Sequence, residues 1–184
     1  AARVLPDAAQ AQAAIEALEQ EHRQVRATLE KSIQTSGAPQ PGSTRPRTGV
    51  AALPAAYETG IDYTPYRRAY TEQQRLMDLK IAPLRDHVRQ AMAEASPALQ
   101  QLATLDAALD QMLSARASRL WLAGPQLMAR RFEQLRKGGA EPETWLDDFG
   151  REMQQTQLAE LDARLQPVLG LIETFSTEVK KNYA

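Results

Sequence analysis

The sequence contains no cysteine, which excludes disulfide bonds, thiolate metal ligands and cysteine nucleophiles. Only two of its 184 residues are histidine. Neither lies near a Gly-x-Ser-x-Gly turn, so the sequence gives no support to a Ser-His-Asp arrangement. We therefore assign no catalytic residue and expect a protein that is not an enzyme.

Aromatic residues are also few, at 5% of a chain that is 43% hydrophobic. β-Branched residues are scarce and do not run together as a strand requires, whereas Ala, Leu, Gln, Glu and Arg, all good helix formers, dominate. We predict an all-α fold. It should be a kinked antiparallel bundle of long helices, with an N-terminal coiled-coil helix and a Pro/Gly-rich linker.

The chain lacks an excess of either charge, since 22 basic and 23 acidic residues leave a net charge of -1. This balance argues against nucleic-acid binding, which usually requires a strong positive excess. Apolar runs are far shorter than the roughly 20 residues that span a bilayer, and no secretory leader is recognisable. We expect a cytoplasmic protein without direct membrane insertion, and the start at Ala1-Ala2 indicates a trimmed chain.

Residues 1–34 predict one long helix with a coiled-coil seam. Its apolar positions alternate in steps of three and four residues, as a and d positions do, with one histidine among them. The seam residues are Ile15, Leu18, His22, Val25 and Leu29. Alone, such a helix buries too little apolar surface to be stable, so it must pack against another helix.

Residues 35–64 have a different composition. Four prolines, four glycines and few large apolar residues predict a flexible linker. Tyr57 and Tyr63, in this linker, are candidates for docking either to a partner or to the protein's own helices. The predicted organisation is thus a coiled-coil helix (1–34), a linker (35–64) and a helical bundle (65–184).

The bundle should contain three helices, the first two opening at Thr64-Pro65 and Ser96-Pro97, where a capping residue precedes proline. Pro83, Pro125 and Pro167 fall inside predicted helices and should bend or interrupt them. The last helix, beginning near Pro142, carries the clearest heptad pattern in the chain. Its apolar face consists of Leu158, Leu161, Leu165, Val168, Ile172, Phe175 and Val179.

The third predicted helix ends in basic residues, and the fourth begins with acidic ones. Each sign suits its own helix dipole, and an antiparallel hairpin would place the two groups side by side. Arg130 and Arg131, in the basic group, are also candidates for contact with a partner.

Glu19 and His22 have the Glu-x-x-His spacing that supplies two ligands in di-iron helical bundles. The second copy of the motif is missing, because His87 has Leu84 three residues before it. A polar seam residue that sets helix register is the better explanation of His22. We assign no metal site and no cofactor.

Four segments of the chain, 96–106, 131–136, 145–149 and 158–173, resemble a proteobacterial family of uncharacterised proteins, domain-of-unknown-function family 3348. The last segment is the most specific, and the resemblance covers nearly all of the chain after about residue 10. Members usually carry a further N-terminal region, and the family implies no activity, cofactor or catalytic residue. Its genes tend to lie beside those of MotA/TolQ/ExbB-type ion-channel proteins and OmpA-like proteins.

From these observations we expect a scaffold or interaction protein that self-associates through its coiled-coil helices. The gene neighbourhood implies a component of an envelope-associated assembly at the inner membrane. One alternative is a regulatory adaptor that binds a cytoplasmic part of a membrane complex through the tyrosine-rich linker and the basic helix end. The other is a helical metal-binding protein or enzyme.

Overall fold

A computed structural model describes residues 8–36, 62–138 and 142–183, and these residues form four long α-helices. Helix α1 spans Ala8–Thr35, α2 spans Thr64–Ala95, α3 spans Pro97–Lys137 and α4 spans Pro142–Tyr183. No strand occurs in the described ranges, so the predicted all-α fold is confirmed. Nearly all of the predicted linker, including Tyr57, lies outside the described residues.

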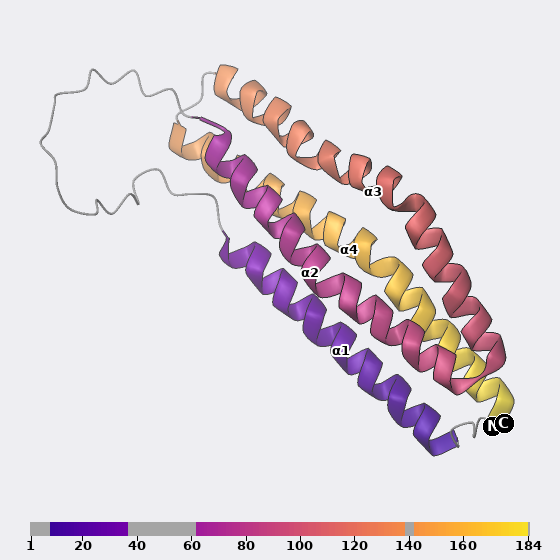
Figure 1. Cartoon of the computed structure of the whole chain (residues 1–184). Helices are drawn as coiled ribbons and strands as arrows, with labels where there is room; N and C mark the ends of the chain where they lie inside the picture. Colours follow the sequence, from indigo (N-terminus) through magenta and orange to yellow (C-terminus); the bar gives the residue numbers. More distant parts are fainter. Residues whose placement is uncertain (1–7, 37–61, 139–141, 184) are drawn as a thin grey trace, which may run out of the picture.

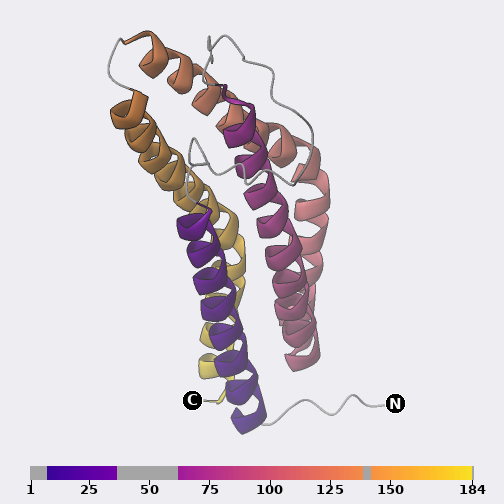
Figure 2. The ribbon, with the colours of Figure 1, turned by 90° about the vertical axis from the view of Figure 1, so that its left-hand side faces the viewer.

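Successive helices run in opposite directions, as Figure 1 shows. Helices α2 and α4 lie in the middle of the bundle and contact each other. Helices α1 and α3 flank this pair from opposite sides, and they do not contact each other within the described segments. Figure 2, turned by 90°, shows α1 beside α4 and α2 beside α3.

The core consists of two buried clusters. The larger is mainly aliphatic and combines residues of α1, α2 and α4 with Leu99 and Ala103 near the start of α3. The smaller is aromatic and joins α2, α3 and α4 around Phe132, whose ring lies 5.1 Å from Trp145 and 5.2 Å from Phe149. Both of those ring pairs are edge-to-face, a favourable geometry for aromatic contacts.

The start of α3 follows the sequence prediction. Ser96 has an extended backbone (φ -159°, ψ 158°), and its hydroxyl oxygen accepts a hydrogen bond from the backbone N–H of Leu99 at 3.2 Å. Pro97 takes the first helical position, where its missing N–H costs nothing. A single residue therefore connects α2 to α3 and reverses the chain.

The start of α2 differs slightly from the prediction. Thr64 is already helical, and the preceding Tyr63 makes no capping hydrogen bond with its side chain. Instead, the carboxylate of Asp62 accepts hydrogen bonds from the Thr64 side chain and backbone, which lowers the pKa of Asp62. An acidic residue is favourable at this end of a helix because it faces the positive end of the dipole.

All three internal prolines lie within continuous helices. Pro83 and Pro167 are exposed, whereas Pro125 is buried. Helix α3 is not broken at Gly124-Pro125, although Figure 1 shows it changing direction along its length.

Candidate interaction surfaces

The two predicted seams meet inside a single chain. Ile15, Leu18 and Leu29 of α1 are fully buried, and Val25 packs against the same aliphatic cluster. The heptad face of α4 lies in this cluster too, with all but Leu158 of its predicted residues buried. Since α1 contacts both α4 and α2, these apolar faces are already covered without a second chain.

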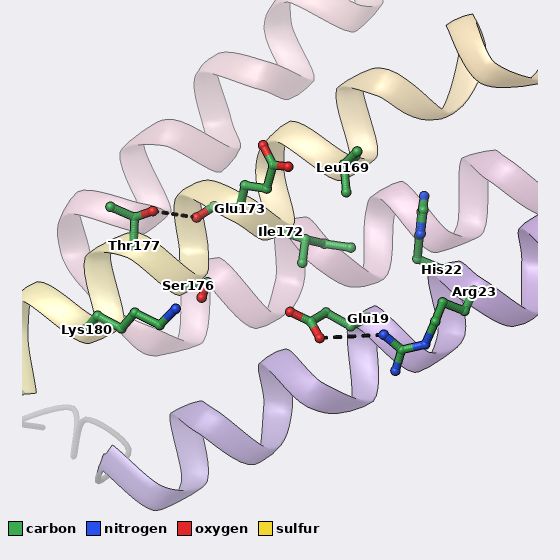
Figure 3. A pocket seen from close by; sticks show the side chains of 9 residues that line it. All are labelled: Glu19, His22, Arg23, Leu169, Ile172, Glu173, Ser176, Thr177 and Lys180. Atoms are coloured by element: carbon green, nitrogen blue, oxygen red, sulfur yellow. Dashed lines mark hydrogen bonds and ion pairs between the residues drawn. The ribbon is translucent and has the colours of Figure 1, made fainter.

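His22 lies in a pocket between α1 and α4, shown in Figure 3. Burial, and then the nearby charges of Arg26 and Arg23, lower the pKa of His22. Its Nε2 atom is buried without a hydrogen-bond partner among the described residues. The imidazole is therefore best accommodated in its neutral form.

The predicted Glu-x-x-His pair does not converge on a common point. The Glu19 carboxylate turns toward Arg23, from which it is separated by 3.6 Å, as Figure 3 shows. Glu173 and Lys180 border the same pocket from α4. Across the segments that the structure describes, no three His, Asp or Glu side chains gather as a set of metal ligands.

The predicted contact between the basic end of α3 and the acidic start of α4 is present. The Arg131 guanidinium donates two hydrogen bonds of 2.6 Å to the Glu152 carboxylate, in a bidentate pair. These hydrogen bonds lower the pKa of Glu152. Arg130 is exposed and forms no ion pair within the described segments. Of the two arginines, only Arg131 therefore links α3 to α4.

Tyr63 docks onto the protein's own bundle. Its hydroxyl donates a 2.6 Å hydrogen bond to the Pro125 carbonyl, and its ring lies 5.5 Å from that of Phe132. Burial raises the pKa of Tyr63 to about 12. Of the two alternatives for this tyrosine, contact with its own helices is the one seen in the structure.

A buried polar network compensates for the proline inside α3. Pro125 has no N–H, so the carbonyl of Trp121 loses its normal helical partner. The side-chain amide of Gln74 on α2 donates a hydrogen bond of 2.8 Å to this carbonyl. The same amide lies 2.9 Å from the buried carboxylate of Glu160 on α4, so it links three helices.

Glu160 accepts hydrogen bonds from two further residues. The Tyr70 hydroxyl donates at 3.0 Å, and Arg164 donates through Nε at 2.8 Å. The guanidinium of Arg164 also lies 4.5 Å from the centre of the Trp121 ring, within the range of a cation–π contact. Burial, followed by the charge of Glu160, raises the pKa of Tyr70. Through Gln74 and Glu160, this network links α3 to α2 and α4.

Most of the exposed large apolar residues lie along one side of α3, and we call this set the α3 stripe. They are Leu102, Leu105, Leu109, Met112, Leu113, Leu120 and Leu127, between 40% and 77% exposed. Apart from the adjacent Met112 and Leu113, they follow one another in steps of three, four and seven residues, which places them on one face of a helix. Leu122 is also exposed but lies on another side of α3.

Polar contacts hold the middle of α3 against the bundle. No residue from 104 to 124 is buried. Instead, Arg85 and Arg89 of α2 form ion pairs of 2.6 to 2.9 Å with Asp106 and Asp110 of α3. Burial alone would raise the pKa of Asp106, but hydrogen bonds from the two arginines outweigh it and lower that pKa. The apolar residues of this segment are thus left to solvent.

The α3 stripe has a basic border. No acidic residue occurs between Asp110 and Glu133, whereas Arg116 and Arg119 lie within this stretch. Together with Leu113 and Leu120 they line a shallow hollow on the surface of α3.

Sequence reasoning missed the stripe because leucines at helical spacing usually indicate a core face. Two signals were available. Leucine repeats at heptad spacing from 113 to 127, and acidic residues are missing from the same stretch.

The fold and these surfaces define a long-helix bundle with an uncovered apolar helix face. The chain belongs to the family described as protein of unknown function (DUF3348), which matches residues 2–177. The resemblance noted in the sequence is thereby confirmed. No curated protein and no solved structure matches the chain. None of the described helices is both long and apolar enough to cross a membrane.

Proposed function

We propose that this protein is a non-enzymatic interaction or scaffold protein, and that the α3 stripe is its main contact surface. The observation that carries this proposal is the exposure of seven large apolar side chains along one helix. Scattered apolar residues are ordinary on a protein surface, but a contiguous patch of several hundred Å² marks a binding surface. Burying the stripe against a partner would remove this apolar area from water.

In this proposal, the α3 stripe is the association surface, a role that the sequence suggested for the coiled-coil seams of α1 and α4. Because α1 and α4 cover each other's apolar faces, self-association through them would require the bundle to open. Contact through α3 requires no such rearrangement, since residues 104–124 add nothing to the core.

In the wider setting, we propose a cytoplasmic component of an envelope-associated assembly at the inner membrane. The gene neighbourhood implied by family membership supports this setting. Self-association and binding to a membrane-complex protein are both compatible with an apolar stripe that has a basic border.

The adaptor alternative is supported by one feature, the exposed Arg130 at the basic end of α3. Reversing its charge in Arg130→Glu leaves the Arg131–Glu152 pair intact. If a salt-sensitive association is lost in this variant but kept in a stripe variant, the adaptor function replaces the scaffold function.

Site-specific photo-crosslinking in cells tests the proposed function. A photoreactive amino acid is placed at Leu120, in the stripe, or at Ser118, which is also exposed but lies on the opposite side of α3. We expect position 120 to capture a defined protein, identified by mass spectrometry, and position 118 to capture none. Equal capture at both positions, or none at either, would overturn the proposal.

A further inference from the structure

The α3 stripe has the heptad pattern of a coiled-coil seam. With Leu113, Leu120 and Leu127 at a positions, Leu102 and Leu109 fall at d positions. All five are exposed, and none belongs to either core cluster.

Three seam positions between Leu102 and Leu127 are not large apolar residues, namely Asp106 at an a position and Arg116 and Ala123 at d positions. Asp106 turns to α2, where it pairs with Arg85 and Arg89. The five leucines have no second helix against them within the described chain.

This seam is complementary to itself when it is turned end for end. The midpoint of the pattern lies between Ser114 and Ala115. Leu102 and Leu127 are equally far from this midpoint, and so are Leu109 and Leu120. An antiparallel copy of α3 would therefore place leucine against leucine in four layers, each pairing an a with a d position. Such a contact uses the same patch on both copies, as a two-fold dimer requires.

The size of the stripe fits a dimer interface. The exposed parts of its seven side chains amount to on the order of several hundred Å² per copy. Specific interfaces bury about 800 Å² per partner, and flanking polar residues would supply the remainder.

The arginines near the centre of the seam predict how the dimer should respond to salt. Arg116, at the d position nearest the midpoint, would face Leu113 of the other copy. Its aliphatic part can cover that leucine while the guanidinium remains in water. Arg116 and Arg119 of both copies would lie near the two-fold axis, so salt should strengthen the dimer by screening their repulsion. Binding of an acidic partner to these arginines would be weakened by salt instead.

We infer that the occupant of the α3 stripe is a second copy of this chain, paired antiparallel about the point between Ser114 and Ala115. The inference rests on the proposed function, because it names the partner of the same surface. Its failure can be told apart from that of the proposed function. A monomeric chain whose stripe still captures another protein in cells would overturn the dimer alone.

The first experiment measures solution mass by light scattering over a range of concentration and salt. We expect a dimer that tightens with salt and that weakens roughly a hundredfold or more in Leu109→Gln/Leu120→Gln, which loses all apolar contact at two layers. Circular dichroism and thermal unfolding check the fold of this variant, which should be retained because neither leucine lies in the core.

A gain-of-association variant makes the test more specific. Arg116→Leu should tighten the dimer roughly tenfold or more, because it converts two arginine–leucine layers into leucine–leucine layers. Ser118→Leu is the matched control. It adds the same side chain on the opposite side of α3 and should leave the dimer unchanged. Equal tightening by both variants would indicate nonspecific hydrophobic association and contradict the inference.

The register can be read from introduced cysteines, since the natural chain has none. Chains carrying Leu109→Cys and chains carrying Leu120→Cys are mixed and oxidised. In the proposed register, position 109 of one copy faces position 120 of the other, so mixed disulfides should dominate. In that dimer two copies of position 109 would lie about 16 Å apart along the helices, too far for a disulfide. Disulfides between identical positions, or a monomer at about 100 μM, where a dimer with micromolar Kd would be nearly complete, would overturn the inference.

Discussion

At the scale of single residues, Gly124 is a position where the α3 backbone lies close to the Tyr70 side chain of α2. A Cβ atom at Gly124 would lie 2.7 Å from the Tyr70 hydroxyl oxygen and 3.1 Å from Cζ of the same ring. The Tyr70 side chain cannot easily move away, because it is fully buried and its hydroxyl is hydrogen-bonded to Glu160. We expect Gly124→Ala to lower the free energy of unfolding by about 1–3 kcal/mol, as overpacking does.

Gly170→Ala is the matched control for this prediction, since a Cβ at Gly170 would meet nothing within 4 Å. Both glycines lie inside long helices, where alanine is favoured by up to about 1 kcal/mol. Chemical denaturation should therefore show opposite signs for the two variants. The cost of Gly124→Ala should also shrink in a Tyr70→Phe background, and an unchanged cost would show that the hydroxyl contact is not its cause.

His22 predicts a dependence of stability on pH. Its pKa is lowered in the folded protein, so the unfolded chain takes up a proton first as the pH falls below the ordinary value of about 6.5. The free energy of unfolding should therefore decrease with acidification from about pH 6.5 until the lowered folded pKa is passed. Arg23, Arg26 and Lys180 add positive charge around the ring, whereas Glu19 and Glu173 oppose it.

Urea denaturation between pH 5 and 8 measures this effect, with His22→Leu as the comparison. The difference between wild type and variant isolates His22 from His87, which pairs with Glu21 on α1 at 2.6 Å. We expect the wild type to lose stability on acidification relative to the variant. Parallel curves would mean that His22 does not titrate differently in the folded and unfolded states.

At the scale of helices, Gln74 replaces the hydrogen bond that Pro125 cannot make. We expect Gln74→Met to lower the free energy of unfolding by about 1–3 kcal/mol, because it leaves the Trp121 carbonyl without a donor and removes a donor from Glu160. In a Pro125→Ala background the backbone N–H of residue 125 can bond to Trp121 again, so the same substitution should cost less. A double-mutant cycle measures this difference, and strict additivity would argue against the compensation.

Some elements could be predicted from the sequence because they follow from local pattern. Most of the heptad face of α4 and of the seam of α1 is buried, although His22, Val25 and Leu158 are only partly so, and Ser96 caps α3 as predicted. The network at Pro125 could not be predicted, because Gln74 and Glu160 lie 86 residues apart and their contact depends on how three helices pack. The α3 stripe was missed for the opposite reason, since its pattern is local but does not reveal whether the face is covered.

At the scale of the whole molecule, the core contacts of α3 are distributed unevenly along its length. Helix α3 contributes buried side chains to the core clusters at both ends, but none between residues 104 and 124. In a Leu109→Gln/Leu120→Gln variant we expect amide hydrogen exchange in residues 111–120 to be faster than in the middle of α2 or α4, because local opening there exposes no core. Uniform protection along α3 would contradict this prediction.

The single residue between α2 and α3 has a consequence for how copies of the chain can combine. If Ser96 became helical, α2 and α3 would merge into one rod on the order of 110 Å long, and α3 could then dock in a neighbour's bundle instead of its own. Pro97 disfavours such domain swapping, because Ser96 precedes a proline and is therefore disfavoured in the α-helical conformation. The Ser96-Pro97 turn thus disfavours the exchange of α3 between chains, so a dimer of the proposed kind would form through the outer surfaces of its copies.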